Sequence, residues 1–218
     1  LILNSIILYP ITYIPGWFGN NLRYFYYKKR CKYLGKKVRI DVGVVINNPE
    51  WISIGDNTWI DKYVLLTAGK IKKDGLRGRI KDNSDFRLKE GELYIGSNVH
   101  IAPFCIIQAH AGVFIGNNLG LSSGVKIYSF SNLPVDPNAP SEEIFFTPMR
   151  RESVYFFAPI VIKDNVGIAL NSVILPGVTI GERSFVAPFS VVISSFKSNS
   201  YIAGNPATRI KNRFLNRE

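Results

Sequence analysis

IKDNVG-IALNSV-ILPGVT-IGERSF-VAPFSV-VISSFK, residues 162–197, consists of six-residue groups that each begin with an aliphatic residue. A period of six fits neither an amphipathic helix, which repeats about every 3.6 residues, nor a half-buried strand, which repeats about every two. It is typical of a solenoid in which each group forms one short strand and one turn. The fifth position is mostly small or β-branched, which suits a narrow interior near a corner. The first positions are Ile162, Ile168, Ile174, Ile180, Val186 and Val192.

The same spacing recurs upstream in three further blocks, so the repeat covers most of the chain. An ordinary β-sandwich is the alternative, but its strands would show no fixed period of six. The sequence therefore predicts an all-β protein, a parallel β-helix of hexapeptide repeats. The upstream blocks are Ile54, Ile60 and Leu66; Ile95, Ile101, Ile107 and Val113; and Ile115, Leu121 and Ile127.

Two segments break the period. Residues 70–92 are polar and highly charged, which predicts a loop or hairpin that projects from the solenoid. Residues 129–159 combine prolines with a cluster of aromatic residues, which predicts a long, packed loop of the kind that often carries function. The predicted organisation is an N-terminal segment (1–37), a β-helix domain (38–213) that contains both loops, and a short tail (214–218).

The N-terminal segment is apolar at first and then basic. Residues 1–18 are almost free of charge, but Pro10 and Pro15 interrupt any helix, which disfavours a transmembrane span. Arg23 is followed by YFYYKKR, a mixture of aromatic and cationic residues suited to a membrane surface. The alternative is a helix that packs on the end of the solenoid and closes its core. The sequence leaves both open.

Charge and cysteine content limit the classes of function. The net charge is +11, and the basic residues gather in KKRCKYLGKK (28–37) and RIKNRFLNR (209–217). Such clusters can contact nucleic acid, anionic lipid or cofactor phosphates, but no motif that enters a nucleic-acid groove is present, so we expect no nucleic-acid partner. Cys31 and Cys105 lack metal-ligand spacing and a CxxC motif, which predicts free thiols and no metal site.

Four motifs carry a family resemblance: IGDNTWID (54–61), IGSNVHIA (95–102), NSVILPGVTIG (171–181) and AGNPATRIKNR (203–213). Over residues 40–213 the chain resembles the hexapeptide-repeat acyltransferases, and in particular the O-acetyltransferases of sugars, nodulation factors and exopolysaccharides. The resemblance implies a left-handed parallel β-helix, a homotrimer, and acyl-CoA bound in the groove between adjacent subunits. It also implies acetyl-CoA as the donor.

Acyl transfer from a thioester to a hydroxyl needs a general base, for which histidine is the usual choice near neutral pH. In the sugar acetyltransferases this histidine follows a segment similar to YSFS, but here Asn132 and Leu133 occupy that place. The Asn132 amide can hydrogen-bond an acceptor but cannot remove its proton. His110, in QAHAGVFIG, is the remaining candidate, because this segment is similar to the histidine-bearing segment of the sugar-nucleotide N-acyltransferases and lipid A acyltransferases.

His110 has a structural alternative, a turn residue with a single hydrogen bond. Three acidic residues of the second loop could orient an imidazole or act as a base themselves: Asp136, Glu142 and Glu143. His100 shares a repeat column with Trp59, Gly120 and Gly167, so we expect a surface role for it.

The resemblance also implies where the cofactor binds. The small residues Ala169, Gly177, Ala187 and Ser194 would lie along the pantetheine arm. Ser194 and the serine after it replace the Lys-Asp pair that is usual there, which removes one phosphate contact. The tail motif supplies Asn205, Pro206, Arg209 and Lys211, of which Arg209 and Lys211 can pair with the cofactor phosphates.

The resemblance implies transfer of an acetyl group from acetyl-CoA to a sugar in surface polysaccharide or glycolipid assembly. A sugar hydroxyl is the favoured acceptor, and a sugar amine is the less favoured one. The expected location is the cytoplasm or the inner face of the cell membrane. The alternative function is a catalytically degenerate trimeric β-helix scaffold, since the loop histidine is missing.

Overall fold

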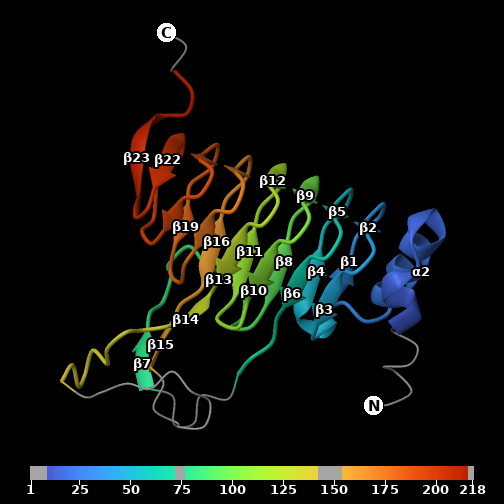
Figure 1. Cartoon of the computed structure of the whole chain (residues 1–218), viewed down its shortest axis with the longest axis horizontal. Helices are drawn as coiled ribbons and strands as arrows, with labels where there is room; N and C mark the ends of the chain where they lie inside the picture. Colours follow the sequence, from blue (N-terminus) through green and yellow to red (C-terminus); the bar gives the residue numbers. More distant parts are fainter. Residues whose placement is uncertain (1–8, 72–76, 142–153, 216–218) are drawn as a thin grey trace.

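The computed structural model describes residues 9–71, 77–141 and 154–215, and Figure 1 shows a solenoid with a helix at one end and a hairpin at the other. Its coils run through three parallel sheets in a constant order, A then B then C. We number the coils by their residues: coil 1 (33–47), coil 2 (52–67), coil 3 (93–108), coil 4 (113–128), coil 5 (160–174) and coil 6 (179–192). The predicted parallel β-helix is confirmed.

Sheet A contains the first strand of every coil. Its inward side chains are fully buried, and register partners such as Ile95 and Ile115 stack directly. The strands in spatial order are β1 (Tyr33–Leu34), β4 (Ile52–Ile54), β8 (Leu93–Ile95), β11 (Val113–Ile115), β16 (Ile160–Ile162) and β19 (Thr179–Ile180).

Sheet B contains the second strand of every coil and ends in an antiparallel hairpin. The hairpin continues the sheet beyond coil 6. The strands in spatial order are β2 (Arg39–Ile40), β5 (Trp59–Ile60), β9 (Val99–Ile101), β12 (Leu119–Leu121), β17 (Gly167–Ile168), β20 (Phe185–Val186), β22 (Ser200–Gly204) and β23 (Ala207–Asn212).

Sheet C contains the third strand of every coil. The first outward side chain is aliphatic in every strand of this sheet except β13, where it is Lys126. In the longer strands a second outward side chain follows, and these are Asn47, Thr67, Gln108 and Tyr128. The strands in spatial order are β3 (Val45–Asn47), β6 (Leu65–Thr67), β10 (Ile106–Gln108), β13 (Lys126–Tyr128), β18 (Val173–Ile174) and β21 (Val191–Val192).

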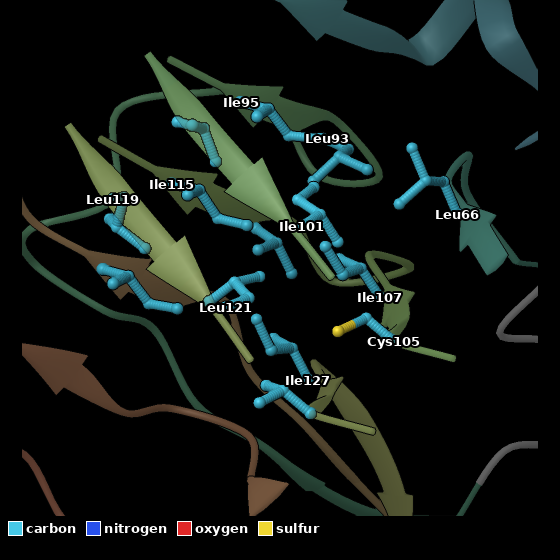
Figure 2. Packing of buried hydrophobic residues seen from close by; sticks show 14 of the residues in the cluster. Leu66, Leu93, Ile95, Ile101, Cys105, Ile107, Ile115, Leu119, Leu121 and Ile127 are labelled. Carbon is cyan, nitrogen blue, oxygen red and sulfur yellow. The ribbon is translucent and has the colours of Figure 1, made fainter. Parts of the chain in front are cut away.

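The core is a stack of the first-position aliphatic side chains, as Figure 2 shows for coils 2 to 4. All six that were read from residues 162–197 are buried, with at most 1% of their surface exposed. The fifth-position residues also point inward, and the serines among them bond to the backbone. Ser172 and Ser190, for example, both donate to the carbonyl of Ala187. The inward column therefore decides which face of each strand is buried.

The coils are not all the same length. In coils 5 and 6, register partners such as Ile162 and Ile180 lie 18 residues apart, which is three hexapeptides. In coils 3 and 4, Ile95 and Ile115 lie 20 residues apart. The two additional residues fall between sheets C and A, where Ala109–Gly112 form a wider turn. The three sheets are the sides of a triangular prism. We call the edge where sheets C and A meet the C–A corner, and the other two edges the A–B and B–C corners.

The A–B corner explains the frequent asparagines of the motifs. Asn57, Asn98 and Asn118 adopt positive φ values between 54 and 56°, a conformation that asparagine tolerates better than most residues. Their amides form a ladder, in which Asn57 Nδ2 donates to Asn98 Oδ1 at 3.2 Å and Asn98 Nδ2 donates to Asn118 Oδ1 at 3.0 Å. The ladder fixes the spacing of successive coils.

Helix α2 (Gly16–Lys28) lies at the N-terminal end of the solenoid (Figure 1). Arg23 of this helix is completely buried, and its Nε donates to the Ile40 carbonyl of coil 1 at 2.8 Å. Its Nη1 donates to the carbonyls of Ile11 and Ile14, both at 2.8 Å. Burial lowers the pKa of Arg23, and the charge of Asp41 opposes that effect. In the described residues, no helix is long and apolar enough to cross a membrane.

The two segments that interrupt the period both leave from the C–A corner, and the described parts of both contribute strands to a small fourth sheet. This sheet D has the order β14 (Phe130–Asn132), β15 (Val154–Phe157), β7 (Arg77–Ile80). It lies outside the prism, beside the C-terminal half of the solenoid (Figure 1). Residues 81–92, which we call the strap, then return along the solenoid from coil 6 to coil 3.

Candidate functional site

The C–A corner of coil 3 carries His110, and it lies between the necks of the two inserted segments. The first neck is closed by the Gly69 amide, which donates to the Gly91 carbonyl at 2.7 Å. The second is closed by the Ala158 amide, which donates to the Ser129 carbonyl at 3.1 Å. His110 is therefore placed where two segments distant in sequence meet.

The hydrogen bond of His110 determines how its ring can act. Its Nδ1 lies 2.8 Å from the Gly69 carbonyl oxygen, which can only accept. Nδ1 must therefore carry the proton, which leaves a free lone pair on Nε2 of the neutral ring. The side chain is half-buried. This is the geometry of an oriented general base, and it depends on the first neck.

Aromatic residues of sheet D form a wall beside His110. Phe130 meets the imidazole edge-on with ring centroids 6.4 Å apart. Tyr155 stacks on Phe130 at 4.5 Å, and Phe157 meets it at 5.9 Å. Such a wall provides apolar surface on which a substrate ring or chain can pack.

The predicted loop residues have separate positions. Asn132 is exposed at the end of β14, where its partner in the antiparallel register is Tyr155. Asp136 is buried and accepts from the Asn138 amide at 2.9 Å, so it belongs to a local turn. Glu142 and Glu143 lie outside the described residues.

Sequence reasoning missed Gln108 and Ser129, two polar residues that support the turn of His110. Ser129 is fully buried; its Oγ accepts from the Ala111 amide at 3.0 Å and donates to the Gln108 carbonyl at 2.9 Å. Gln108 Oε1 is, within the described residues, a buried side-chain oxygen without a hydrogen-bond partner. Gln108 directly precedes the widened turn in the sequence, whereas Ser129 meets that turn only in the folded chain.

The strap covers the turn of His110 from the side of sheet A. The Phe86 ring lies against Gly112, where a Cβ would come within 2.2 Å of its Cζ atom. Gly112 also has a φ of +108°, so both the turn and the contact require glycine. The strap therefore packs on the solenoid over residues 81–92 rather than projecting from it.

The predicted cofactor residues fall on two corners. Gly177 and Ser194 lie on the C–A corner, in coils 5 and 6, on the same edge as His110. The others lie on the B–C corner or on the hairpin beyond it: Ala169, Ala187, Asn205, Pro206, Arg209 and Lys211. Within one chain the structure does not bring the two groups together.

The basic tail is partly engaged in internal contacts. Arg209 Nε donates to Ser200 Oγ at 3.1 Å, and Lys211 Nζ lies 5.5 Å from the centre of the Tyr201 ring. Both residues remain exposed on β23. They keep free surface for an anionic ligand on the sheet B side.

His100 lies on the outer face of sheet B, away from the C–A corner. Its Nε2 is 3.1 Å from Asp61 Oδ2, and its ring lies beside Trp59. The register places it in one column with Trp59, Gly120 and Gly167, as the repeat predicted. Its described contacts are those of a surface residue.

Both cysteines are free. Desolvation raises the pKa of Cys105 to about 11 and that of Cys31 to about 12, so neither thiol ionises readily near neutral pH. No group of His, Cys, Asp or Glu side chains in the described residues has the arrangement of a metal site.

No family model matches the chain. Among curated proteins, one from Saccharomyces cerevisiae that is named as an acetyltransferase is 34% identical over 119 residues. The alignment covers 55% of this chain and 55% of that protein. The chain spans about half the length of the first such relatives. The dTDP-4-amino-4,6-dideoxy-D-glucose acyltransferase of Escherichia coli is 27% identical over 84% of this chain and 82% of its own. Galactoside O-acetyltransferase of E. coli is 27% identical over 57% of this chain and 66% of its own.

Solved structures show the same architecture. A variant of AntD, an N-acyltransferase from Bacillus cereus in complex with dTDP and coenzyme A, is 25% identical. It superposes with a TM-score of 0.67 over 86% of this chain and 88% of its own. The repeat motifs, the solenoid and these relatives agree. The chain is thus similar to acyltransferases in sequence and in fold.

Proposed function

We propose that the chain is an acyl-CoA-dependent acyltransferase that moves an acetyl group from acetyl-CoA to a sugar hydroxyl or amine, with His110 as the general base. The observation that carries the proposal is the 2.8 Å contact between His110 Nδ1 and the Gly69 carbonyl, since it leaves Nε2 free to accept a proton. The relatives support the donor, because AntD was solved with coenzyme A and the others are named as acyltransferases.

The reaction follows from this geometry. His110 Nε2 takes the proton from the acceptor O–H or N–H while the acceptor atom attacks the thioester carbonyl. The tetrahedral intermediate then expels the CoA sulfur, and the imidazolium returns the proton to the departing thiolate. The Gly69 carbonyl stabilises the imidazolium, because it accepts from Nδ1 throughout.

The relatives include enzymes that acylate an amine and enzymes that acylate a hydroxyl. AntD is an N-acyltransferase and the galactoside enzyme is an O-acetyltransferase. AntD and the dTDP-amino-sugar acyltransferase each match more than four-fifths of this chain. An amino sugar linked to a nucleotide is therefore the first acceptor to assay, and a simple glycoside is the second. The proposed setting is the assembly of a surface polysaccharide or glycolipid.

A homotrimer would join the divided cofactor residues. If three prisms pack with sheet C toward a common axis, the C–A corner of one subunit meets the B–C corner of the next. Gly177 and Ser194 would then face Ala169 and Ala187 of a neighbour across one groove. Aliphatic side chains on the outer face of sheet C, such as Ile106 and Val173, support this packing, as do the exposed aromatic residues of the B–C corner: Tyr63, Phe104 and Phe189.

Oligomeric state tests the packing directly. Phe104→Arg places a charge within the proposed interface, where the exposed phenyl ring now stacks on Tyr63 at 5.6 Å. Light scattering after size exclusion should give three subunits for the unmodified chain and one for the variant. A monomeric unmodified chain that retains full activity would contradict the trimer.

The N-terminal helix supports a membrane-surface contact at the cytoplasmic face. Its buried side, which includes Arg23, rests on coil 1, whereas aromatic side chains point outward, with Trp17 80% exposed. The exposed aromatics of α2 are Trp17, Phe18 and Phe25, and Tyr9 and Tyr13 are exposed just before it. Residues 28–30 add positive charge, which anionic lipid attracts. Cosedimentation with phosphatidylserine vesicles, but not with phosphatidylcholine vesicles, is expected, and Trp17→Ser should weaken it.

Activity is tested with purified protein, acetyl-CoA and two acceptors, dTDP-4-amino-4,6-dideoxyglucose and a galactoside. Calorimetry first measures acetyl-CoA binding without any acceptor, and saturable binding near one site per chain is expected. Mass spectrometry of the acceptor then identifies the acetylated product. Absence of acetyl-CoA binding at millimolar concentration would refute the proposal and leave the trimeric scaffold.

A further inference from the structure

A glycine supplies the carbonyl that orients His110. This residue, Gly69, is buried at the first neck and has a φ of +94°. Glycine adopts positive and negative φ values almost equally well, so it does little by itself to fix the direction of the peptide groups on either side of it. Hydrogen bonds from other parts of the chain must therefore hold the Gly69 carbonyl toward the imidazole, from which it accepts at 2.8 Å.

The Ala68–Gly69 peptide group is held at both of its polar atoms. Its carbonyl, on Ala68, accepts from Asn48 Nδ2 at 2.7 Å. Its amide, on Gly69, donates to the Gly91 carbonyl at 2.7 Å. The carbonyl and the amide of a planar trans peptide point in opposite directions, so partners on both sides prevent the group from rotating. The next carbonyl along the chain is the one that His110 contacts.

The partner on one side, Gly91, has a fixed position at the start of coil 3. The next residue, Glu92, is 8% exposed, and its carbonyl accepts from the Val113 amide at 3.0 Å. Its carboxylate accepts from Lys32 Nζ at 2.6 Å. A Cβ at Gly91 would lie 2.7 Å from the Lys70 amide nitrogen, so the two sides of the neck are in close contact. The Gly91 carbonyl is therefore a firm acceptor.

The partner on the other side, Asn48, comes from the corner that follows coil 1. It precedes the 3₁₀ helix η1 (Pro49–Trp51) but makes no side-chain capping bond to it, although asparagine often caps helices. Its amide nitrogen lies 3.1 Å from the place that a Cβ of Gly69 would occupy. The side chain of Asn48 thus packs directly against the glycine that orients His110.

Three successive C–A corners are joined in this way. The register of sheet C stacks the residues that follow β3, β6 and β10, which are Asn48, Ala68 and Ala109. The A–B corner differs, because its ladder joins asparagine side chains to one another and touches no backbone carbonyl beside a candidate base. The amide of Asn48 instead bonds to the backbone from which His110 takes its orientation.

We propose that Asn48 is a positioning residue for the acyl transfer: it fixes the Ala68–Gly69 peptide, and through it the carbonyl that keeps the proton of His110 on Nδ1 and the lone pair on Nε2. Without this bond the peptide can turn about the glycine, and the Gly69 carbonyl no longer selects one tautomer of the imidazole. The effect of Asn48 on the ring depends only on the fold, whereas its effect on turnover rests on the proposed function.

Asn48→Gly tests this role without straining the backbone, since Asn48 has a φ of +54° and glycine accepts that value. The matched control is Asn57→Gly. Asn57 has the same φ of +54°, is likewise exposed, and loses its side-chain donation to Asn98 in the A–B ladder. The two variants should have comparable thermal melts, so a difference between their histidine spectra does not arise from unfolding.

The spectrum is simple, because the chain contains only two histidines, His100 and His110. With ¹⁵N-labelled histidine in the full chain, correlations between ring protons and ring nitrogens show which nitrogen of a neutral imidazole carries the proton. In the unmodified chain and in Asn57→Gly, the proton of His110 should be on Nδ1 alone. In Asn48→Gly both tautomers should be populated, while the signals of His100 stay unchanged.

Turnover gives a second readout. The kcat of Asn48→Gly should be about 10- to 100-fold below that of Asn57→Gly, because a misplaced base removes the acceptor proton less efficiently. Acetyl-CoA affinity, measured by calorimetry, should be the same in both. A His110 ring that stays protonated on Nδ1 alone in Asn48→Gly would overturn the inference, whatever the turnover. An altered ring with unchanged kcat would support the hold on the ring and refute His110 as the base, so the two proposals can fail separately.

Discussion

Replacement of His110 by asparagine separates the proton-transfer role of the ring from its structural role. Asparagine Nδ2 takes nearly the place of imidazole Nδ1, so the variant can still donate to the Gly69 carbonyl, which is 2.8 Å away in the unmodified chain. What it loses is the basic Nε2. The first neck and the turn around Ala109–Gly112 should therefore persist, while the base is absent.

The expected loss follows from the usual contribution of general-base catalysis, about 100- to 10,000-fold in kcat. That factor corresponds to about 3–5 kcal/mol of transition-state stabilisation. Acetyl-CoA affinity should stay within about a factor of two, because neither the imidazole nor its replacement has a proposed contact with the cofactor.

The assay follows release of the CoA thiol at saturating acetyl-CoA with the acceptor that the screen identifies. The rise of kcat/KM with pH that reports deprotonation of the base should disappear in the variant. His100→Asn is the matched control, since it removes a histidine from the outer face of sheet B and should leave turnover unchanged. Turnover of His110→Asn within threefold of the unmodified chain would refute the reasoning and direct attention to the described part of the 129–159 segment.

Three further outcomes concern the scaffold. Arg23→Met leaves buried carbonyls without a donor and should lower the free energy of unfolding by about 3 kcal/mol or more, measured by urea denaturation; a change below 1 kcal/mol would contradict the clamp. Gly112→Ala forces a side chain into a positive φ and against Phe86, and should cost about 1–3 kcal/mol and a lower Tm, whereas Gly120→Ala, with open space around it, should not. Cys105 should stay unreactive toward an aromatic disulfide at pH 8 in the folded protein, because burial raises its pKa to about 11, and should react only after denaturation; rapid native labelling would contradict its burial.

The pH dependence of stability follows from the same burial. The folded state of Cys105 has the higher pKa, so it holds its proton where the unfolded thiol has lost it. The contribution to stability is therefore complete below the unfolded pKa of about 8.5 and decreases as the pH rises from there toward 11. Cys31 acts in the same direction. Unfolding experiments above pH 9 should show this loss, and Cys105→Ala should reduce it.

The period of six predicted the coils well because the inward column is a local property of the sequence. Each aliphatic residue from Ile162 to Val192 is buried by its neighbours in adjacent coils, whichever coil is considered. The two additional residues at Ala109–Gly112 were harder to place, since a widened turn keeps the column intact and changes only the corner. The sequence showed them as the double register of Val113 and Ile115.

The candidate site depended on contacts that no local pattern contains. His110 was identified from the sequence, but its partner Gly69 lies 41 residues away, at the neck of a different segment. The pairing of β7 with β15 and the return of the strap to Thr179 likewise join residues far apart in the chain. The sequence could not show that Ala169 and Ala187 lie on the B–C corner and Gly177 on the C–A corner. Every hexapeptide has the same pattern, so the pattern does not reveal which corner a residue occupies.

The helix at one end and the hairpin at the other have a consequence for colloidal behaviour. An uncovered terminal coil exposes unpaired backbone amides and carbonyls around an apolar cross-section. Other chains can pair with such an edge and form fibrils. Here Arg23 fastens a helix over coil 1, and β23 turns back along β22 so that the last edge runs antiparallel and carries Arg209 and Lys211. The molecule thus has a defined length, and its two ends do not match each other. Removal of residues 1–28 would uncover coil 1 while β23 still closes the other end, so two particles should associate through their uncovered ends.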